Sequence, residues 1–459
     1  MTNPTDREDV RAGRFWLPDQ SENAVSGRLT LPEAARCRLE LDEALTPLLR
    51  EVDGGQQPSG ARTLVLKESG PGREHLVVHG VLEDGALVTL VDAVESRRET
   101  GHGQDRQWLR AWSAVLGGHV SGGDEVYTRM RLRLRHIDSW AGPGAPSPVS
   151  LGSGGWLDLE QERQSGVSEI EGGPVGRAAW LRLVDLPPLT VEELDRCFAT
   201  PLASLVTLAA DTDCPPVAVE VATAPDEPWL TLHHSGLQAS SEETWPWYRQ
   251  LLPLPLLGLE RVATWLNAVE QLGPLPPVIA RAAAGSGGTL ETQLLELTTV
   301  AEGLHRRLFP ESRRLSEEHA SAARAAVNAA TSDLNEEVRA GVNAAMQHIA
   351  EPSFPRRLME LARCAESAVP GVTGQTNRWK GCVTEVRNEF AHRIKGFLQT
   401  ARIDELVAVR ESLRWLLTGL LLLQTGLPPA ELAGRLGDHQ RYALFLLQAR
   451  DRLPRIFDA

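Results

Sequence analysis

The hydrophobic pattern of this 459-residue chain changes at about residue 245. Before that point, short apolar and β-branched runs such as EHLVVHG and RMRLRLRHI are bounded by glycine and proline, which is typical of strands and turns. Beyond it, apolar residues recur with the period of amphipathic helices, about 3.6 residues. We therefore predict an α+β multidomain protein, with a mostly β N-terminal domain followed by an all-α helical bundle.

Glycine and proline mark the expected domain boundaries. We predict a mostly β domain over 1–245, a helical connector over 246–284 and a helical bundle over 285–459, with the boundary at the GSGG segment, Gly285 to Gly288. The helical segments expected in the bundle are Thr289 to Phe309, Ser316 to Ile349, Phe354 to Val369, Arg378 to Thr400, Ile403 to Thr425, and Ala430 to Leu453 with a break near Gly437.

Composition excludes several classes of protein. A net charge of -14 argues against general coating of nucleic acid, so any RNA contact must be local. The five cysteines are widely spaced and odd in number, which suggests neither a disulfide framework nor a zinc site and fits a reducing cytoplasm. The apolar stretch Trp415 to Leu427 is shorter than the roughly 20 residues of a membrane span, so we expect a buried core helix.

One helical segment, Arg378 to Thr400, combines an apolar stripe with a polar face. On a helical wheel the stripe contains Val383, Val386, Phe390, Ile394 and Phe397. Asn388 and His392 fall almost opposite this stripe, and Arg387 lies on its flank. His392 is therefore not placed as a core histidine.

One interpretation of this polar face is metal-independent RNA cleavage, because histidine and arginine are the residue types that this reaction uses. The reaction needs a group that titrates near neutrality to move the 2′-hydroxyl proton, which suits His392. It also needs a fixed cation on the phosphate, which suits Arg387. The alternative, which periodicity alone favours, is that His392 and Asn388 are solvated surface residues.

The sequence RNEFAH, from Arg387 to His392, resembles the R-x4-6-H signature of HEPN (higher eukaryotes and prokaryotes nucleotide-binding) proteins. The segment ETQLLELTTVAEGLHRRLF resembles the first HEPN helix of the ApeA-like group. In the front half, FWLPDQSENAVSGRLTL, VVHGVLEDGALVTLVDA, VLGGHV and RLRHIDSWAG resemble the N-terminal domain of ApeA-type phage-defence proteins. The segment LERVATWLNAVEQLGPLPPVI is similar to the link that precedes their HEPN domain.

The resemblance implies an abortive-infection effector with a HEPN endoribonuclease domain. It assigns His392 as general base or acid, Arg387 as phosphate clamp, Asn388 as an orienting group and Glu302 as an acidic position on the first helix. It further implies cleavage of RNA, with transfer RNA favoured, to 2′,3′-cyclic phosphate ends, without metal or cofactor. Basic residues on the motif helix are expected to bind the substrate: Arg378, Lys380, Arg393 and Lys395.

The resemblance also concerns partners. We expect a homodimer or higher oligomer through the HEPN domain, and a phage-derived trigger, protein or nucleic acid, that acts through the N-terminal domain. The rival hypothesis is a catalytically silent HEPN sensor or scaffold that recruits another effector; the presence of both Arg387 and His392 counts against it.

Two basic clusters leave alternatives open. Arg129, Arg131, Arg133 and Arg135 fall on one face of a predicted strand, where pairing with neighbouring acids is the default and binding of RNA or an acidic partner the alternative. The cluster from His305 to Arg307, followed by Arg313 and Arg314, is either a solvated helix end or an RNA contact.

Overall fold

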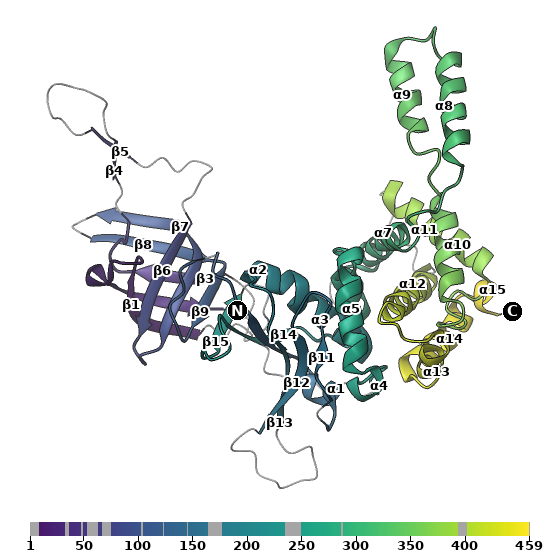
Figure 1. The fold of residues 1–459 in the computed structure, drawn as a ribbon. Coiled ribbons are helices and arrows are strands. Elements are labelled where there is room, and N and C mark those ends of the chain that lie inside the picture. The colour runs from purple at the N-terminus through teal and green to yellow at the C-terminus, as the bar shows by residue number, and fades with distance from the viewer. Residues whose placement is uncertain are drawn as a thin grey trace. The chain divides into compact units, whose positions relative to one another are not determined.

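The computed structural model (Figure 1) separates into two compact units. The first contains Met1–Ala203 and Cys214–Trp245, and the second contains Ser204–Asp213 and Pro246–Ala459. The structure describes residues 9–32, 36–46, 49–52, 63–66, 75–101, 104–122, 124–144, 146–163, 177–234, 249–285, 288–392 and 402–458.

The first unit is built on a 13-stranded antiparallel sheet, part of which closes into a barrel. The barrel strands follow the order β6–β1–β2–β3–β8–β7, and the 15-residue strand β7 closes the ring because it pairs with both β6 and β8. Their bounds are β1 (Asp9–Trp16), β2 (Val25–Leu31), β3 (Cys37–Leu41), β6 (Leu76–Leu82), β7 (Leu87–Gly101) and β8 (Gln104–Ala111). Strands β4 (Leu49–Val52) and β5 (Thr63–Leu66) form a separate pair.

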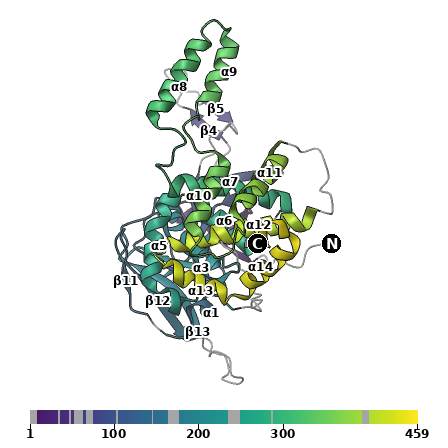
Figure 2. The ribbon, with the colours of Figure 1, turned by 90° about the vertical axis from the view of Figure 1, so that its right-hand side faces the viewer.

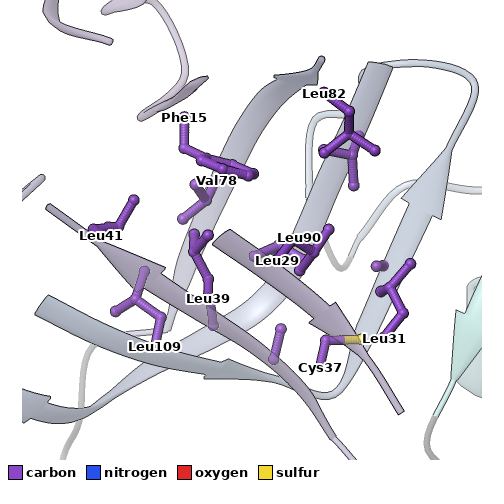
Figure 3. Packing of buried hydrophobic residues seen from close by; sticks show 14 residues of the cluster. Phe15, Leu29, Leu31, Cys37, Leu39, Leu41, Val78, Leu82, Leu90 and Leu109 are labelled. Carbon is purple, nitrogen blue, oxygen red and sulfur yellow. The ribbon is translucent and has the colours of Figure 1, made fainter. Parts of the chain in front are cut away.

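Side chains point alternately into and out of the barrel along each strand, and the inward side chains fill it. Phe15, Leu39 and Leu109 are among the side chains that pack inside it, each 0–1% exposed (Figure 3). Gly80 makes room for the Phe15 ring, because a Cβ at this position would lie 2.5 Å from Phe15 Cδ1. Residues between the inward positions face outward, as expected for a half-buried strand.

The sheet continues beyond the barrel through β9, β15, β14, β10, β13, β12 and β11. The bounds of these strands are β9 (Ser113–Leu116), β10 (Arg129–Leu134), β11 (Val149–Ser150), β12 (Trp156–Arg163), β13 (Arg177–Val184), β14 (Pro216–Ala222) and β15 (Leu230–His234). On β10, Arg131 pairs with Glu220 and Glu162, both at 2.5 Å. The default interpretation of this arginine face, pairing with neighbouring acids, is therefore confirmed for Arg131.

The front half also contains helices that the strand pattern did not predict. Besides the short η1 (Ser21–Asn23) and α1 (Ile137–Ala141), a run of α2 (Val191–Leu194), η2 (Asp195–Ala199) and α3 (Thr200–Ala210) interrupts the strands. The run begins at a capping box, in which Thr190 and Glu193 bond reciprocally. In the sequence, the T-x-x-E spacing of these two residues was the signal that a helix begins here. Helix α3 starts in the first unit and ends in the second.

The second unit is helical, as the sequence predicts. Its helices are α4 (Leu254–Leu257), α5 (Leu259–Leu272), α6 (Leu275–Ala284), α7 (Leu290–Leu308), α8 (Glu317–Ala330), α9 (Glu336–Met346), α10 (Phe354–Ala365), α11 (Thr376–His392), α12 (Ile403–Leu423), α13 (Pro429–Gly437), α14 (Gln440–Arg452) and α15 (Pro454–Phe457). The predicted order, a mostly β front half followed by an all-α bundle, is confirmed.

Helix α12 is the centre of this unit. It packs against α6, α7, α10 and α14, and its residues Ser412 to Leu422 are all buried. The prediction that Trp415 to Leu427 contains a core helix is confirmed. Among the residues that the structure describes, no helix has both the length and the apolar character needed to cross a membrane.

The segment from Ser316 to Ile349 is not one helix, as the periodicity suggested. It forms the two helices α8 and α9, which lie side by side in both views (Figures 1 and 2). The break falls at a TSDLN turn, where the Asn335 side chain accepts a hydrogen bond from the Val338 N–H at 2.9 Å and so starts α9. A cap residue therefore overrides the continuous alanine-rich pattern.

Candidate functional site on helices α7, α10 and α11

Helix α11 carries the R-x4-H motif. Val383 and Val386 are 0% and 2% exposed and pack toward the core, while Asn388 on the opposite side is exposed. These three positions agree with the helical wheel, but Phe390 is only half-buried. His392 is the last residue of α11, and its side chain lies outside the described structure, as do the residues Ile394 and Phe397.

The structure brings Arg387 together with Glu302, which lies 85 positions away on α7. Arg387 Nη2 donates to Glu302 Oε2 at 3.1 Å. The guanidinium also lies over the ring of Phe354, at the start of α10, with 4.5 Å between Cζ and the ring centroid. Two helices therefore hold the arginine of the motif, while its side chain remains 34% exposed.

The Glu302 carboxylate is surrounded by cations. Its Oε1 accepts from Arg306 Nη2 at 3.3 Å and lies 3.9 Å from Arg357 Nε. Arg306 and Arg357 also reach Glu351, at 3.1 and 2.7 Å respectively. With Arg387, three guanidiniums converge on one carboxylate, so Glu302 acts as the hub that links α7, α10 and α11.

A buried chain of polar groups lies behind this hub. The Arg357 side chain is 5% exposed; its Nε donates to Pro352 O at 3.0 Å and its Nη1 lies 3.4 Å from His305 Nδ1. His305 Nε2 lies 2.7 Å from Glu360. Because a guanidinium only donates, His305 Nδ1 must accept, and the neutral ring then donates through Nε2 to Glu360.

The pKa values of this chain fit that arrangement. Burial lowers the pKa of His305, and the bond to Glu360 opposes the shift without reversing it. Burial alone would raise the pKa of Glu360, but hydrogen bonds from Arg356, His305 and Ser312 together lower it to about 2. At neutral pH the imidazole of His305 is thus neutral and lies between the guanidinium of Arg357 and the carboxylate of Glu360.

The other predicted substrate-binding residues do not gather at this hub. Lys380, half-buried, lies about two turns before Arg387 on the same side of an ideal helix. Arg378 falls on the opposite side of α11, and its Nη1 donates to Arg455 O at 2.8 Å. Arg393 and Lys395 lie outside the described residues. The substrate-binding role of all four residues stays a prediction.

The residues of the basic cluster at the end of α7 make two different kinds of contact. His305 and Arg306 belong to the network just described, whereas Arg307 donates to Gln271 O at 3.3 Å and Arg313 to Pro310 O at 2.6 Å. Arg307 therefore joins the end of α7 to α5, whereas Arg313 bonds to backbone three residues before it.

Three members of the polar network around Glu302 were missed by sequence reasoning: Glu351, Arg357 and Glu360. The spacing of Arg356 and Glu360 on α10 signals a local pair, which the structure contains at 2.9 Å. This spacing does not predict the residues on α7 that the neighbouring Arg357 contacts. Within the described residues, no group of three or more histidine, cysteine or acidic side chains is arranged to hold a metal ion.

Comparison with protein families places these features in context. Residues 295–431 match the Apea-like HEPN family, a range that contains Glu302, Arg387 and His392, so the second unit contains a HEPN domain. Residues 10–167 match ApeA N-terminal domain 1. The chain is therefore an ApeA-type protein with a C-terminal HEPN domain, and belongs among HEPN-containing defence proteins. Searches of curated proteins and of solved structures found no match.

Proposed function

We propose that this protein is an antiviral abortive-infection effector whose HEPN domain is a metal-independent endoribonuclease. The observation that carries the proposal is the pair of Arg387 and Glu302, because it holds the motif arginine in a defined position and leaves its guanidinium partly exposed. A fixed and accessible cation is what a phosphate in a developing transition state requires.

The proposed chemistry is attack of a 2′-hydroxyl on the adjacent phosphate. His392 takes the 2′-hydroxyl proton, the new oxygen–phosphorus bond forms, and the bond to the 5′-oxygen breaks. The 5′-oxygen takes a proton from water as it leaves, and His392 releases the proton that it took to water, so the products are a 2′,3′-cyclic phosphate and a 5′-hydroxyl. Arg387 stabilises the charge on the phosphate, and Asn388, exposed beside it on α11, orients the substrate.

Glu302 fits a positioning role better than that of a proton acceptor. Its Oε2 accepts from Arg387 and its Oε1 from Arg306, so both oxygens already have donors. Oε2 lies 3.1 Å from Arg387 Nη2, and Oε1 lies 3.3 Å from Arg306 Nη2. We assign to Glu302 the task of orienting the Arg387 guanidinium.

The remaining proposals rest on family analogy. Transfer RNA is the substrate that we favour, two or more copies act together through the HEPN domain, and the N-terminal domain receives a phage-derived trigger. We expect the protein to act in the cytoplasm.

A catalytically silent HEPN sensor is the second candidate, and one observation favours it. The ion pair with Glu302 and the contact with Phe354 are enough to explain Arg387 as a structural residue. In that case the HEPN domain would bind a partner and recruit another effector.

Cleavage of RNA by the full-length protein and its variants distinguishes the two candidates. Arg387→Ala and His392→Ala should each lower the cleavage rate by at least about 100-fold with the fold retained. The matched control Arg450→Ala, which removes an exposed arginine from α14, should leave the rate unchanged. If Arg387→Ala and His392→Ala protect cells from phage as well as the parent does, the silent candidate is correct.

A further inference from the structure

The outer surface of the barrel carries a group of arginines and tryptophans. Leu39 on β3 and Leu109 on β8 point into the barrel (Figure 3), so the residues between such positions point outward. The outward residues of β8 and those beside them on β7 and β3 form what we call the arginine–tryptophan face: Arg36, Arg38, Arg97, Arg106, Trp108, Arg110 and Trp112.

The two tryptophans of this face already stack with guanidiniums. Arg36 Cζ lies 3.6 Å from the centroid of the Trp112 ring. Arg97 and Arg106 lie 5.1 and 5.4 Å from the centroid of Trp108. Trp112 nevertheless remains 42% exposed. Part of its ring is therefore accessible to a planar ligand.

The face also has a local excess of positive charge. Arg38 on β3 and Arg110 on β8 occupy directly opposite positions in the ladder, an arrangement that is unfavourable for two like charges. Glu40 pairs with Arg106 at 2.7 Å, Asp42 lies 4.0 Å from the same guanidinium and Glu99 pairs with Arg97, so the five guanidiniums outnumber these three carboxylates. Such a surface, in a chain of net charge -14, is suited to an anion.

We propose that the arginine–tryptophan face binds single-stranded nucleic acid. Unpaired bases stack on Trp112 and Trp108, and the exposed guanidinium of Arg110 contacts the phosphate between them. Stacking on an aromatic side chain needs a base that is free of its partner strand, which favours a single strand over a duplex. An acidic protein would satisfy the arginines but would not use the exposed tryptophan ring.

This site lies in the first unit, apart from the HEPN motif in the chain, and does not depend on nuclease activity. It would let the N-terminal domain recognise a nucleic acid directly, either as the signal of infection or as the RNA to be cut. The chemistry common to both is a single strand of bases and phosphates. RNA and DNA of the same sequence show which of the two nucleic acids the face prefers, and preference for DNA would exclude the RNA to be cut.

The test is fluorescence anisotropy with a short labelled oligonucleotide and the full-length chain carrying His392→Ala, which prevents cleavage of the RNA probe. Trp112→Ala should weaken binding roughly 5- to 150-fold, the range expected for one lost base stack. Trp112→Phe should restore most of the affinity because it keeps an aromatic face. The matched control is Trp156→Ala, which removes a tryptophan of 47% exposure from β12.

The charge contribution is measured by repeating the titration at several salt concentrations. Arg110→Ala should reduce the slope of log affinity against log salt by about 0.7, one phosphate contact to a single strand. Arg196→Ala, at an exposed position of η2, should leave the slope unchanged. Binding of RNA, DNA or both with this Trp112 and Arg110 dependence supports the site and shows which nucleic acid it accepts.

Two results would overturn the proposal. The first is that neither oligonucleotide binds, or that Trp112→Ala and Trp156→Ala weaken binding equally. The second is that polyglutamate binds with a dependence on Arg110 while the oligonucleotides do not, which would assign the face to an acidic protein. Circular dichroism of each variant shows whether its fold is retained.

Discussion

Replacing Arg357 by methionine should destabilise the helical unit strongly, although this residue lies outside the R-x4-H motif. The change removes a guanidinium whose side chain is 5% exposed and which bonds Glu351, Pro352 O and His305. Methionine retains the length and the apolar stem but has no donor. Two carboxylates and a buried imidazole then lose a shared partner.

The magnitude follows from the burial of the groups left behind. Removing one partner of a buried ion pair costs about 3–5 kcal/mol, because the other charge stays buried without compensation. Glu302 and Glu351 are 24% and 36% exposed and both keep Arg306 as a partner, so the lower end of this range, about 3 kcal/mol, applies. For a unit of this size each kcal/mol shifts Tm by roughly 2–4 °C, which predicts a loss of about 6–12 °C.

The neighbouring residue supplies a matched control. Arg356 is on the same helix but is 46% exposed, and it makes an i,i+4 pair with Glu360 at 2.9 Å. Arg356→Met should cost about 0.3–0.5 kcal/mol, a shift of about 1–2 °C. Thermal melts of the full chain followed by far-ultraviolet circular dichroism report mainly the helical unit. If the two variants melt at the same temperature, the buried network does not stabilise this unit as argued.

Three further predictions concern the same unit. The free energy of unfolding should fall as pH drops from 4.5 to about 2, because the pKa of Glu360 is lower in the folded than in the unfolded chain; Glu360→Gln should flatten this loss in acid titrations. Phe390→Ala should cost about 1–2 kcal/mol in urea unfolding, less than a full core position, since Phe390 is half-buried. RNA cleavage should persist in EDTA; loss with chelator and recovery with Mg²⁺ would contradict the roles given to Arg387 and His392.

Periodicity was sufficient to predict the main helices. The apolar residues of α7 and α12 repeat with the helical period, and their observed bounds, Leu290–Leu308 and Ile403–Leu423, lie within two residues of the predicted ones. The exceptions have local causes. The Asn335 cap splits α8 from α9, and the capping box at Thr190 begins helices within a region of strands.

The contacts of the site could be predicted only in part. Sequence resemblance selected Arg387 and Glu302, and the structure brings them within 3.1 Å. The chain formed by Arg357, His305 and Glu360 could not be predicted, because it depends on which side chains of α7 and α10 meet. Helical periodicity tells which residues face the core, but not which partner they find there.

The chemical ends of RNA cut by the full-length protein test the central claim most directly. In triggered cells, sequencing of RNA termini should find fragments with 2′,3′-cyclic phosphate and 5′-hydroxyl ends, and these should disappear with Arg387→Ala and with His392→Ala. Fragments with 5′-phosphate and 3′-hydroxyl ends, or cyclic ends that persist in both variants, would contradict the claim that this pair carries out a metal-independent cleavage.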